Sequence, residues 1–319
     1  MANSESTDRK IWVDRAKGMG ILLVVYGHVI LGLYPTNLAS ENTFLYHTYL
    51  TIYSFHMPLF FFLSGLFVLR WTTRRILPAS VQKADSLLRP YIVWSIAFSI
   101  LLSIFGTYAN NEHAINLSLI AIQPSAHLWF LYVLFFVFAT YYLLAKLHNE
   151  RIVMLLVSLL FFLSPYIHFW VLGQLFFYLF FFTCGAWYAK YSKRINTQFS
   201  LLYAMTFLSL FAAMCYLIQT NILPTIPITQ LFCALFGILS CIELSKLSIS
   251  WLVPLGSLSM AIYVAHPIFT AGVRTALHHT KFLQLDTFIV SLLCFTAGIV
   301  GSIGLLYVSK VCRIKKYIY

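Results

Sequence analysis

Residues 11–32, IWVDRAKGMGILLVVYGHVILG, lead from a charged segment into an apolar run at 18–34, close to the 20 residues that a helix needs to span a bilayer. Runs of this length recur along the chain of 319 residues, of which 61% are hydrophobic and only 9% are charged. Soluble domains carry about 25% charged residues. The runs also lack the short alternating segments of an outer-membrane barrel. We therefore predict an all-α integral membrane protein.

The hydrophobic pattern predicts a bundle of about ten transmembrane helices. The continuous apolar run 152–189 is too long for one helix, and Ser164-Pro165 marks a turn between two spans. The spans are expected at 18–34, 49–69, 90–109, 127–147, 152–169, 171–189, 199–219, 229–245, 253–273 and 287–308.

Short tails and loops connect these spans. The chain is expected to be a single membrane domain, 1–319, with a short N-terminal tail at 1–11 and a basic C-terminal tail at 309–319. No room remains for a separate water-soluble catalytic domain. Any chemistry must therefore take place among the helices.

The distribution of positive charge predicts the orientation. Of the 21 Lys and Arg residues, all but Arg274 and Lys281 fall on the side of the N-terminus in the ten-helix arrangement. The positive-inside rule then places both termini in the cytoplasm and predicts a multi-pass protein of the cell inner membrane, in contact with lipids. The net charge of +12 thus reflects topology, and we do not expect nucleic-acid binding.

His28 is the clearest ionisable residue inside a predicted span, where such residues are costly and usually functional. A neutral imidazole near the midplane suits a general base, a nucleophile or a proton relay, or a polar contact to a neighbouring helix. Lys17 precedes His28 by three helical turns, so both project from nearly the same face about 16 Å apart. This pair suits a long anionic donor whose phosphates stay at the basic surface.

Two more features could serve such a donor and its acceptor. In FHMPLFFFLSGLF, His56 and Pro58 are expected to interrupt an aromatic helix, and His56 would bind substrate or fill the core. The following loop, RWTTRRILPASVQKADSLLRPY, would bind the phosphates of the donor, although any cytoplasmic loop is expected to be basic. Its candidate phosphate ligands are Arg70, Arg74, Arg75 and Arg89.

Further histidines and a tryptophan lie on the outer half of the predicted bundle. In AHLWFLYVLFF, His127 and Trp129 would suit a sugar, because an apolar sugar face stacks on an indole; Trp129 is equally typical of an interface anchor. His266 lies in SLSMAIYVAHPIF and, like His56, closely precedes a proline. No recognisable metal-ligand motif occurs, and no metal is expected.

Five runs in order resemble the membrane-bound acyltransferase-3 family, especially its carbohydrate O-acetyltransferases: WVDRAKGMGILLVVYGHV, FHMPLFFFLSGLF, LLRPYIVW, AHLWFLYVLFF and SLSMAIYVAHPIF. The resemblance implies transfer of an acyl group, usually acetyl, from cytoplasmic acetyl-CoA to a hydroxyl of a cell-surface or lipid-linked glycan. The family's basic residue ahead of a histidine matches Lys17 and His28, with Lys where Arg is common. The family's two arginines separated by two residues have no strict match here.

These expectations combine into one hypothesis and two rivals. His28 is the predicted catalytic residue; Lys17 and the four loop arginines are predicted to bind acetyl-CoA; and His56, His127, Trp129 and His266 are predicted to line the acceptor site. A proton-coupled transporter or flippase with His28 as the coupling residue is the main rival. A scaffold subunit of a glycan-assembly complex is another. A homo-oligomer or glycan-assembly partners are also compatible with the sequence.

Overall fold

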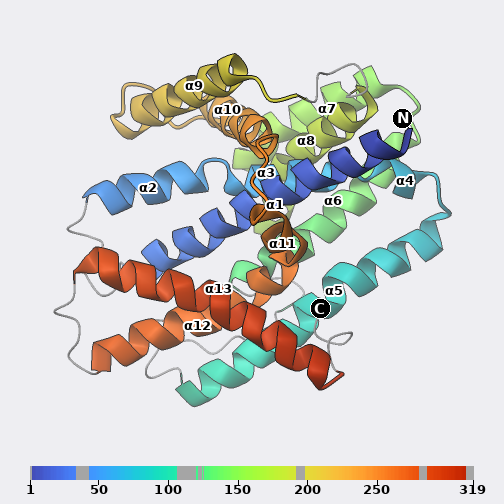
Figure 1. Ribbon diagram of the computed structural model, residues 1–319. Coiled ribbons are helices and arrows are strands. Elements are labelled where there is room, and N and C mark those ends of the chain that lie inside the picture. The colour runs from blue at the N-terminus through green and yellow to red at the C-terminus, as the bar shows by residue number, and fades with distance from the viewer. Residues whose placement is uncertain are drawn as a thin grey trace.

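The protein is an all-helical bundle in the residues that the computed structural model describes, which are 2–33, 43–105, 120, 124, 126–191, 198–279 and 286–313 (Figure 1). The described part contains no strand. In chain order its helices are α1 (Ala2–Leu33), α2 (Thr43–Tyr53), α3 (His56–Gly65), α4 (Leu69–Thr72), α5 (Ile76–Phe105), the 3-10 helix η4 (Ala126–Leu128), α6 (Trp129–Ala145), α7 (Glu150–Leu163), the 3-10 helix η5 (Ser164–Tyr166), α8 (Trp170–Tyr191), α9 (Leu201–Gln219), α10 (Pro227–Ser245), α11 (Leu252–Ser257), α12 (Ser259–His279) and α13 (Thr287–Val311).

Seven of the described helices are long and apolar enough to cross a membrane. The all-helical membrane architecture agrees with the sequence analysis. The count of about ten spans and the cytoplasmic position of both termini stay predictions. The seven candidate spans are Ile11–Leu33, Ile76–Ile104, Trp129–Leu147, Trp170–Tyr191, Leu201–Gln219, Pro227–Ser245 and Thr287–Val311.

The span expected at 49–69 consists of two helices, with the interruption at the place where His56 and Pro58 predicted it. The helices α2 and α3 are separated by Ser54 and Phe55. Pro58 explains the break, because a proline has no backbone N–H to donate to the preceding turn and is tolerated only near the start of a helix. The break places His56 at the first residue of α3.

The turn expected at Ser164-Pro165 is confirmed. The helix α7 ends at Leu163, η5 follows, and α8 begins at Trp170. However, α7 has only 14 residues and is not among the seven candidate spans. The helix α12 is also not among them; its 21 residues include Pro267 and Arg274.

The helix α1 crosses the middle of the bundle and packs on α2, α3, α10, α11, α12 and α13 (Figure 1). A reciprocal glycine contact brings α1 close to α11. A Cβ at Gly18 would overlap the backbone of Leu252, and a Cβ at Gly256 would overlap the backbone of Asp14. Small residues of this kind let two membrane helices approach closely. This contact holds Lys17 beside the start of α12.

A second reciprocal contact joins α3 to α8. A Cβ at Gly65 would overlap the backbone of Phe182, and a Cβ at Gly185 would overlap the backbone of Phe62. Each glycine therefore makes room for the backbone of the other helix. The contact fixes the height of α3 in the bundle, and with it the position of His56.

Candidate active site

Three of the predicted histidines meet in the interior. The ring centroids of His28 and His266 are 5.1 Å apart, those of His127 and His266 are 5.4 Å apart, and those of His28 and His127 are 6.1 Å apart. We call these three residues the histidine cluster. They come from α1, η4 and α12, so residues that are remote in sequence form one site.

The hydrogen bonds of His28 and His266 determine which ring nitrogen is available for chemistry. The Nδ1 atom of His28 lies 2.8 Å from the carbonyl oxygen of Val24. The Nδ1 atom of His266 lies 3.0 Å from the carbonyl oxygen of Ile262 and 2.8 Å from that of Tyr263. A carbonyl oxygen only accepts hydrogen bonds, so Nδ1 carries the proton in both rings. Each neutral ring therefore keeps a lone pair on Nε2.

His56 adjoins the histidine cluster through an aromatic ring. Its side chain is 2% exposed, and Nδ1 donates to the carbonyl oxygen of Ile52 over 2.7 Å. The ring of Tyr53 lies 4.7 Å from that of His56 and 6.2 Å from that of His28, centroid to centroid. His56 thus has the same Nδ1–H tautomer as His28 and faces the cluster across Tyr53.

His127 is held in place from α12. Its Nε2 atom lies 3.4 Å from the carbonyl oxygen of Val264, and the hydroxyl of Tyr263 donates to the backbone carbonyl of His127 itself. Nε2 therefore carries the proton, and the lone pair lies on Nδ1. The ring of Phe98 covers His127 at a centroid distance of 5.1 Å.

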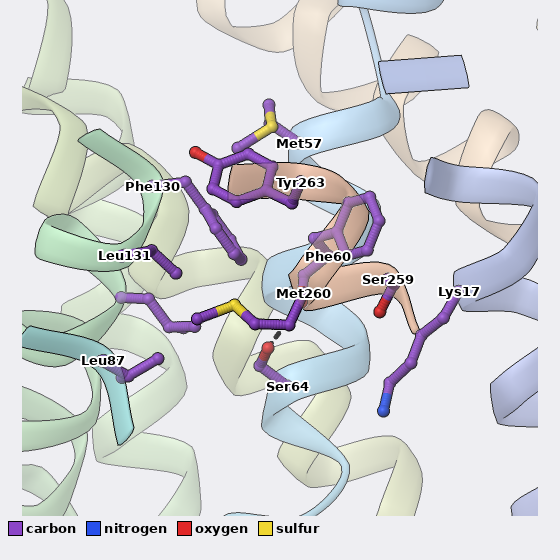
Figure 2. A pocket seen from close by; sticks show the side chains of 11 residues that line it. Lys17, Met57, Phe60, Ser64, Leu87, Phe130, Leu131, Ser259, Met260 and Tyr263 are labelled. Atoms are coloured by element: carbon purple, nitrogen blue, oxygen red, sulfur yellow. Dashed lines mark hydrogen bonds between the residues drawn. The ribbon is translucent and has the colours of Figure 1, made fainter. Parts of the chain in front are cut away.

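An apolar cavity of about 160 Å³ connects Lys17 with Tyr263. Figure 2 shows the side chain of Lys17 entering from α1 and the ring of Tyr263 from α12, with apolar side chains between them. Tyr263 also contacts His127, with centroids 5.6 Å apart. None of the three clustered histidines lines the cavity, so Tyr263 is the lining residue that joins it to the histidine cluster. The other residues that line the cavity are Met57, Phe60, Ser64, Leu87, Phe130, Leu131, Leu134, Ser259 and Met260.

The four loop arginines do not line this cavity. Arg70, Arg74 and Arg75 are exposed, and a guanidinium nitrogen of Arg74 donates to Gln82 over 2.6 Å. Arg89 forms an ion pair of 3.1 Å with Asp85 on its own helix. Binding of the donor by these arginines stays a prediction.

Trp129 packs into an aromatic layer beside α8. Its ring contacts those of Phe61, Trp170 and Tyr178 at centroid distances of 6.5, 5.8 and 5.4 Å. Within the described chain, none of these rings also contacts His127. The expected stacking of a sugar on Trp129 beside His127 stays a prediction.

Sequence reasoning missed two tyrosines of the site. Tyr53 and Tyr263 each precede a histidine of the site by three residues, at His56 and His266. Tyr263 and His266 therefore lie on one face of α12, whereas Tyr53 ends α2 and His56 begins α3. Both histidines also closely precede a proline. The repeated Y-x-x-H pattern was therefore a usable signal for both tyrosines.

The described part of the chain holds no group of three or more His, Cys, Asp or Glu side chains placed to hold a metal ion. The hydrogen bonds of the histidine cluster leave a lone pair on each ring, and such a lone pair can take part in proton transfer or nucleophilic attack. The site combines unprotonated ring nitrogens with an adjoining apolar cavity that a cation also lines.

These features define a multi-pass membrane protein with a buried histidine site. The chain belongs to the acyltransferase-3 family, whose model, described as an acyltransferase domain, matches residues 10–307. The match covers nearly all of the described helices and supports a membrane acyltransferase. No curated protein and no solved structure was found to match the chain.

Proposed function

We propose that this protein transfers an acetyl group from cytoplasmic acetyl-CoA to a hydroxyl of a cell-surface or lipid-linked glycan. The proposal rests on the cavity that Lys17 and Tyr263 both line. Tyr263 also contacts His127 of the histidine cluster. Acetyl-CoA has phosphates at one end and a thioester at the other. The phosphates would lie near the cation of Lys17, and the thioester would lie near the unprotonated nitrogens of the histidine cluster.

The donor side of the site begins at Lys17. Its ammonium group is half-buried and lies 5.4 Å from the ring centroid of Phe67. A half-buried ammonium group attracts phosphate oxygens through charge-assisted hydrogen bonds. The apolar walls beyond it, including Met57 and Leu131, suit the slender pantetheine arm of coenzyme A. Arg70, Arg74, Arg75 and Arg89 would add positive charge near the entrance.

His28 is the proposed catalytic residue. His28 is partly buried, and its Nε2 atom has a free lone pair because Nδ1 donates to Val24. As a general base, Nε2 would take the proton of the acceptor hydroxyl while the oxygen attacks the thioester carbonyl carbon. As a nucleophile, Nε2 would first take the acetyl group itself. In both routes the C–S bond breaks and the proton ends on the coenzyme A sulfur.

The acceptor would approach the histidine cluster from the side of His56 and His127. Buried histidines and tyrosines offer hydrogen-bond partners to the hydroxyls of a sugar. Trp129 completes the proposed acceptor side, whereas His266 is fully buried.

The test is acetyl transfer from radiolabelled acetyl-CoA in membranes that contain equal amounts of the intact protein or of His28→Ala. We expect label in a glycan fraction with the intact protein and a loss of about 100-fold or more with the variant. His168→Ala is the matched control, because His168 is exposed in the turn before α8. Absence of label from every glycan fraction with the intact protein would contradict the proposal.

A proton-coupled transporter or flippase is the second candidate, with His28 as the coupling residue. The observation in its favour is the burial of several histidines in one bundle, which also suits proton passage. The same membranes distinguish the two candidates. A transporter would move a glycan or its lipid carrier in a His28-dependent way without incorporating label from acetyl-CoA.

A further inference from the structure

His266 has a nitrogen that nothing in the resting site satisfies. Its side chain is 0% exposed, and its Nε2 atom is buried without a hydrogen-bond partner. Only two other side-chain atoms in the described chain share this condition, Arg15 Nε and Glu243 Oε2. Buried polar atoms are normally paired, and an exception needs an explanation. For a lone pair, the missing group is a hydrogen-bond donor.

The groups around His266 offer no such donor while the rings are neutral. Nδ1 of His28 donates to Val24, and the hydroxyl of Tyr263 donates to the carbonyl of His127. The titratable groups that face His266 are His28 from α1, His127 from η4 and Tyr263 from its own helix. From α13, the neighbour is Gly298, which has no side chain. Every ring nitrogen that remains free in this cluster carries a lone pair.

A proton on His28 would supply the donor. Protonation turns Nε2 of His28 from an acceptor into a donor, and the two rings lie 5.1 Å apart with an angle of 67° between their planes. At this distance and angle the edge of one ring already faces the other ring. The Nδ1 bonds to Ile262 and Tyr263 fix the orientation of His266 and leave Nε2 as its only free nitrogen.

We infer that His266 is a positioning residue that accepts a hydrogen bond from protonated His28 and so stabilises the imidazolium formed during acyl transfer. The inference rests on the proposed function. The acceptor O–H bond breaks and its proton moves to His28 Nε2; the oxygen bonds to the acyl carbon and the C–S bond breaks. His266 holds the His28 proton through an N–H···N bond until it moves to the coenzyme A sulfur. Atoms and electrons then balance as ester plus free thiol.

The roles of His28 and His266 therefore differ. His28 contacts substrate, whereas His266 acts through His28 from a sealed position. Replacing His266 should therefore slow the chemical step without changing donor binding. A role in packing alone would not require a lone pair at this position.

The test uses the full-length protein in membranes and three variants of His266. His266→Leu removes the lone pair at similar size, His266→Gln keeps an acceptor oxygen, and His266→Gly leaves room for an added small molecule. We expect kcat of His266→Leu to fall about 100-fold with the KM for acetyl-CoA unchanged. His266→Gln should retain several-fold more activity than His266→Leu.

Chemical rescue separates the lone pair from the volume of the ring. Added imidazole should raise the rate of His266→Gly, whereas pyrrole should not, because pyrrole has a similar size but no basic nitrogen. This comparison stands even if His266→Leu does not fold. Equal rescue by the two molecules, or an unchanged kcat in folded His266→Leu, would overturn the inference.

The same measurements distinguish failure of this inference from failure of the proposed function. Acetyl transfer that depends on His28 but not on His266 would overturn only this inference. Absence of transfer by the intact protein would overturn both.

Discussion

Tyr263 donates a hydrogen bond from its hydroxyl to the backbone carbonyl of His127. The bond joins α12 to the short helix η4, which carries His127 into the histidine cluster. Tyr263 also forms part of the cavity wall that begins at Lys17. One side chain thus connects the proposed donor channel with the rings at which acyl transfer would occur.

Replacing Tyr263 by Phe should destabilise the protein by about 1–3 kcal/mol, because the buried carbonyl of His127 loses its donor. The measurement is thermal unfolding of the purified protein in detergent. Tyr216→Phe is the control, because Tyr216 is 64% exposed. Equal unfolding temperatures for the two variants would show that the bond contributes nothing to stability.

Removing the cation of the cavity should weaken donor binding. We expect Lys17→Ala to raise the KM for acetyl-CoA about 10- to 100-fold, the loss expected for one hydrogen bond to a charged group. Lys17→Arg should restore most of the affinity, since the positive charge is kept. Lys310→Ala, an exposed lysine at the end of α13, is the control. An unchanged KM in Lys17→Ala would remove Lys17 from the donor site.

The exposed arginines should act through long-range attraction. Alanine at Arg70, Arg74 or Arg75 should raise the KM for acetyl-CoA only a few-fold at low salt, and the effect should vanish at about 1 M salt, where charges are screened within about 3 Å. The measurement is KM at two ionic strengths. A large effect that persists at high salt would instead indicate a direct phosphate contact.

Adding a methyl group at the close contact between α3 and α8 should lower the stability of the protein. Gly185→Ala should destabilise the protein by about 1–3 kcal/mol, because the new Cβ would overlap the backbone of Phe62. Gly272→Ala and Gly304→Ala are matched controls, since no atom lies within 4 Å of a Cβ at either position. These controls should unfold at the same or a slightly higher temperature, as alanine favours a helix over glycine.

Local patterns in the sequence predicted several elements of the fold. The continuous apolar run of α1 predicted its helix and the shared face of Lys17 and His28. Ser164-Pro165 predicted the turn before α8, because proline ends the preceding helix. His56 and Pro58 likewise predicted the interruption before α3, because proline has no backbone N–H to donate to the preceding turn.

The convergence of the site could not be predicted in the same way. His28, His127 and His266 were each recognised as polar residues in apolar surroundings. Their meeting depends on how α1, η4 and α12 pack, and a single sequence does not contain these contacts. For the donor, the sequence predicted both Lys17 and the arginines of a basic loop; Lys17 lines the cavity, and binding of the donor by the arginines stays a prediction.

The histidine cluster draws one ring from the first helix and another from α12, near the end of the chain. During synthesis, His28 enters the membrane long before the ribosome has made His266. The nascent protein therefore lacks a complete site until its last helices are inserted and packed on α1. Loss of the C-terminal helices, by premature termination or proteolysis, would leave a membrane-embedded but inert fragment.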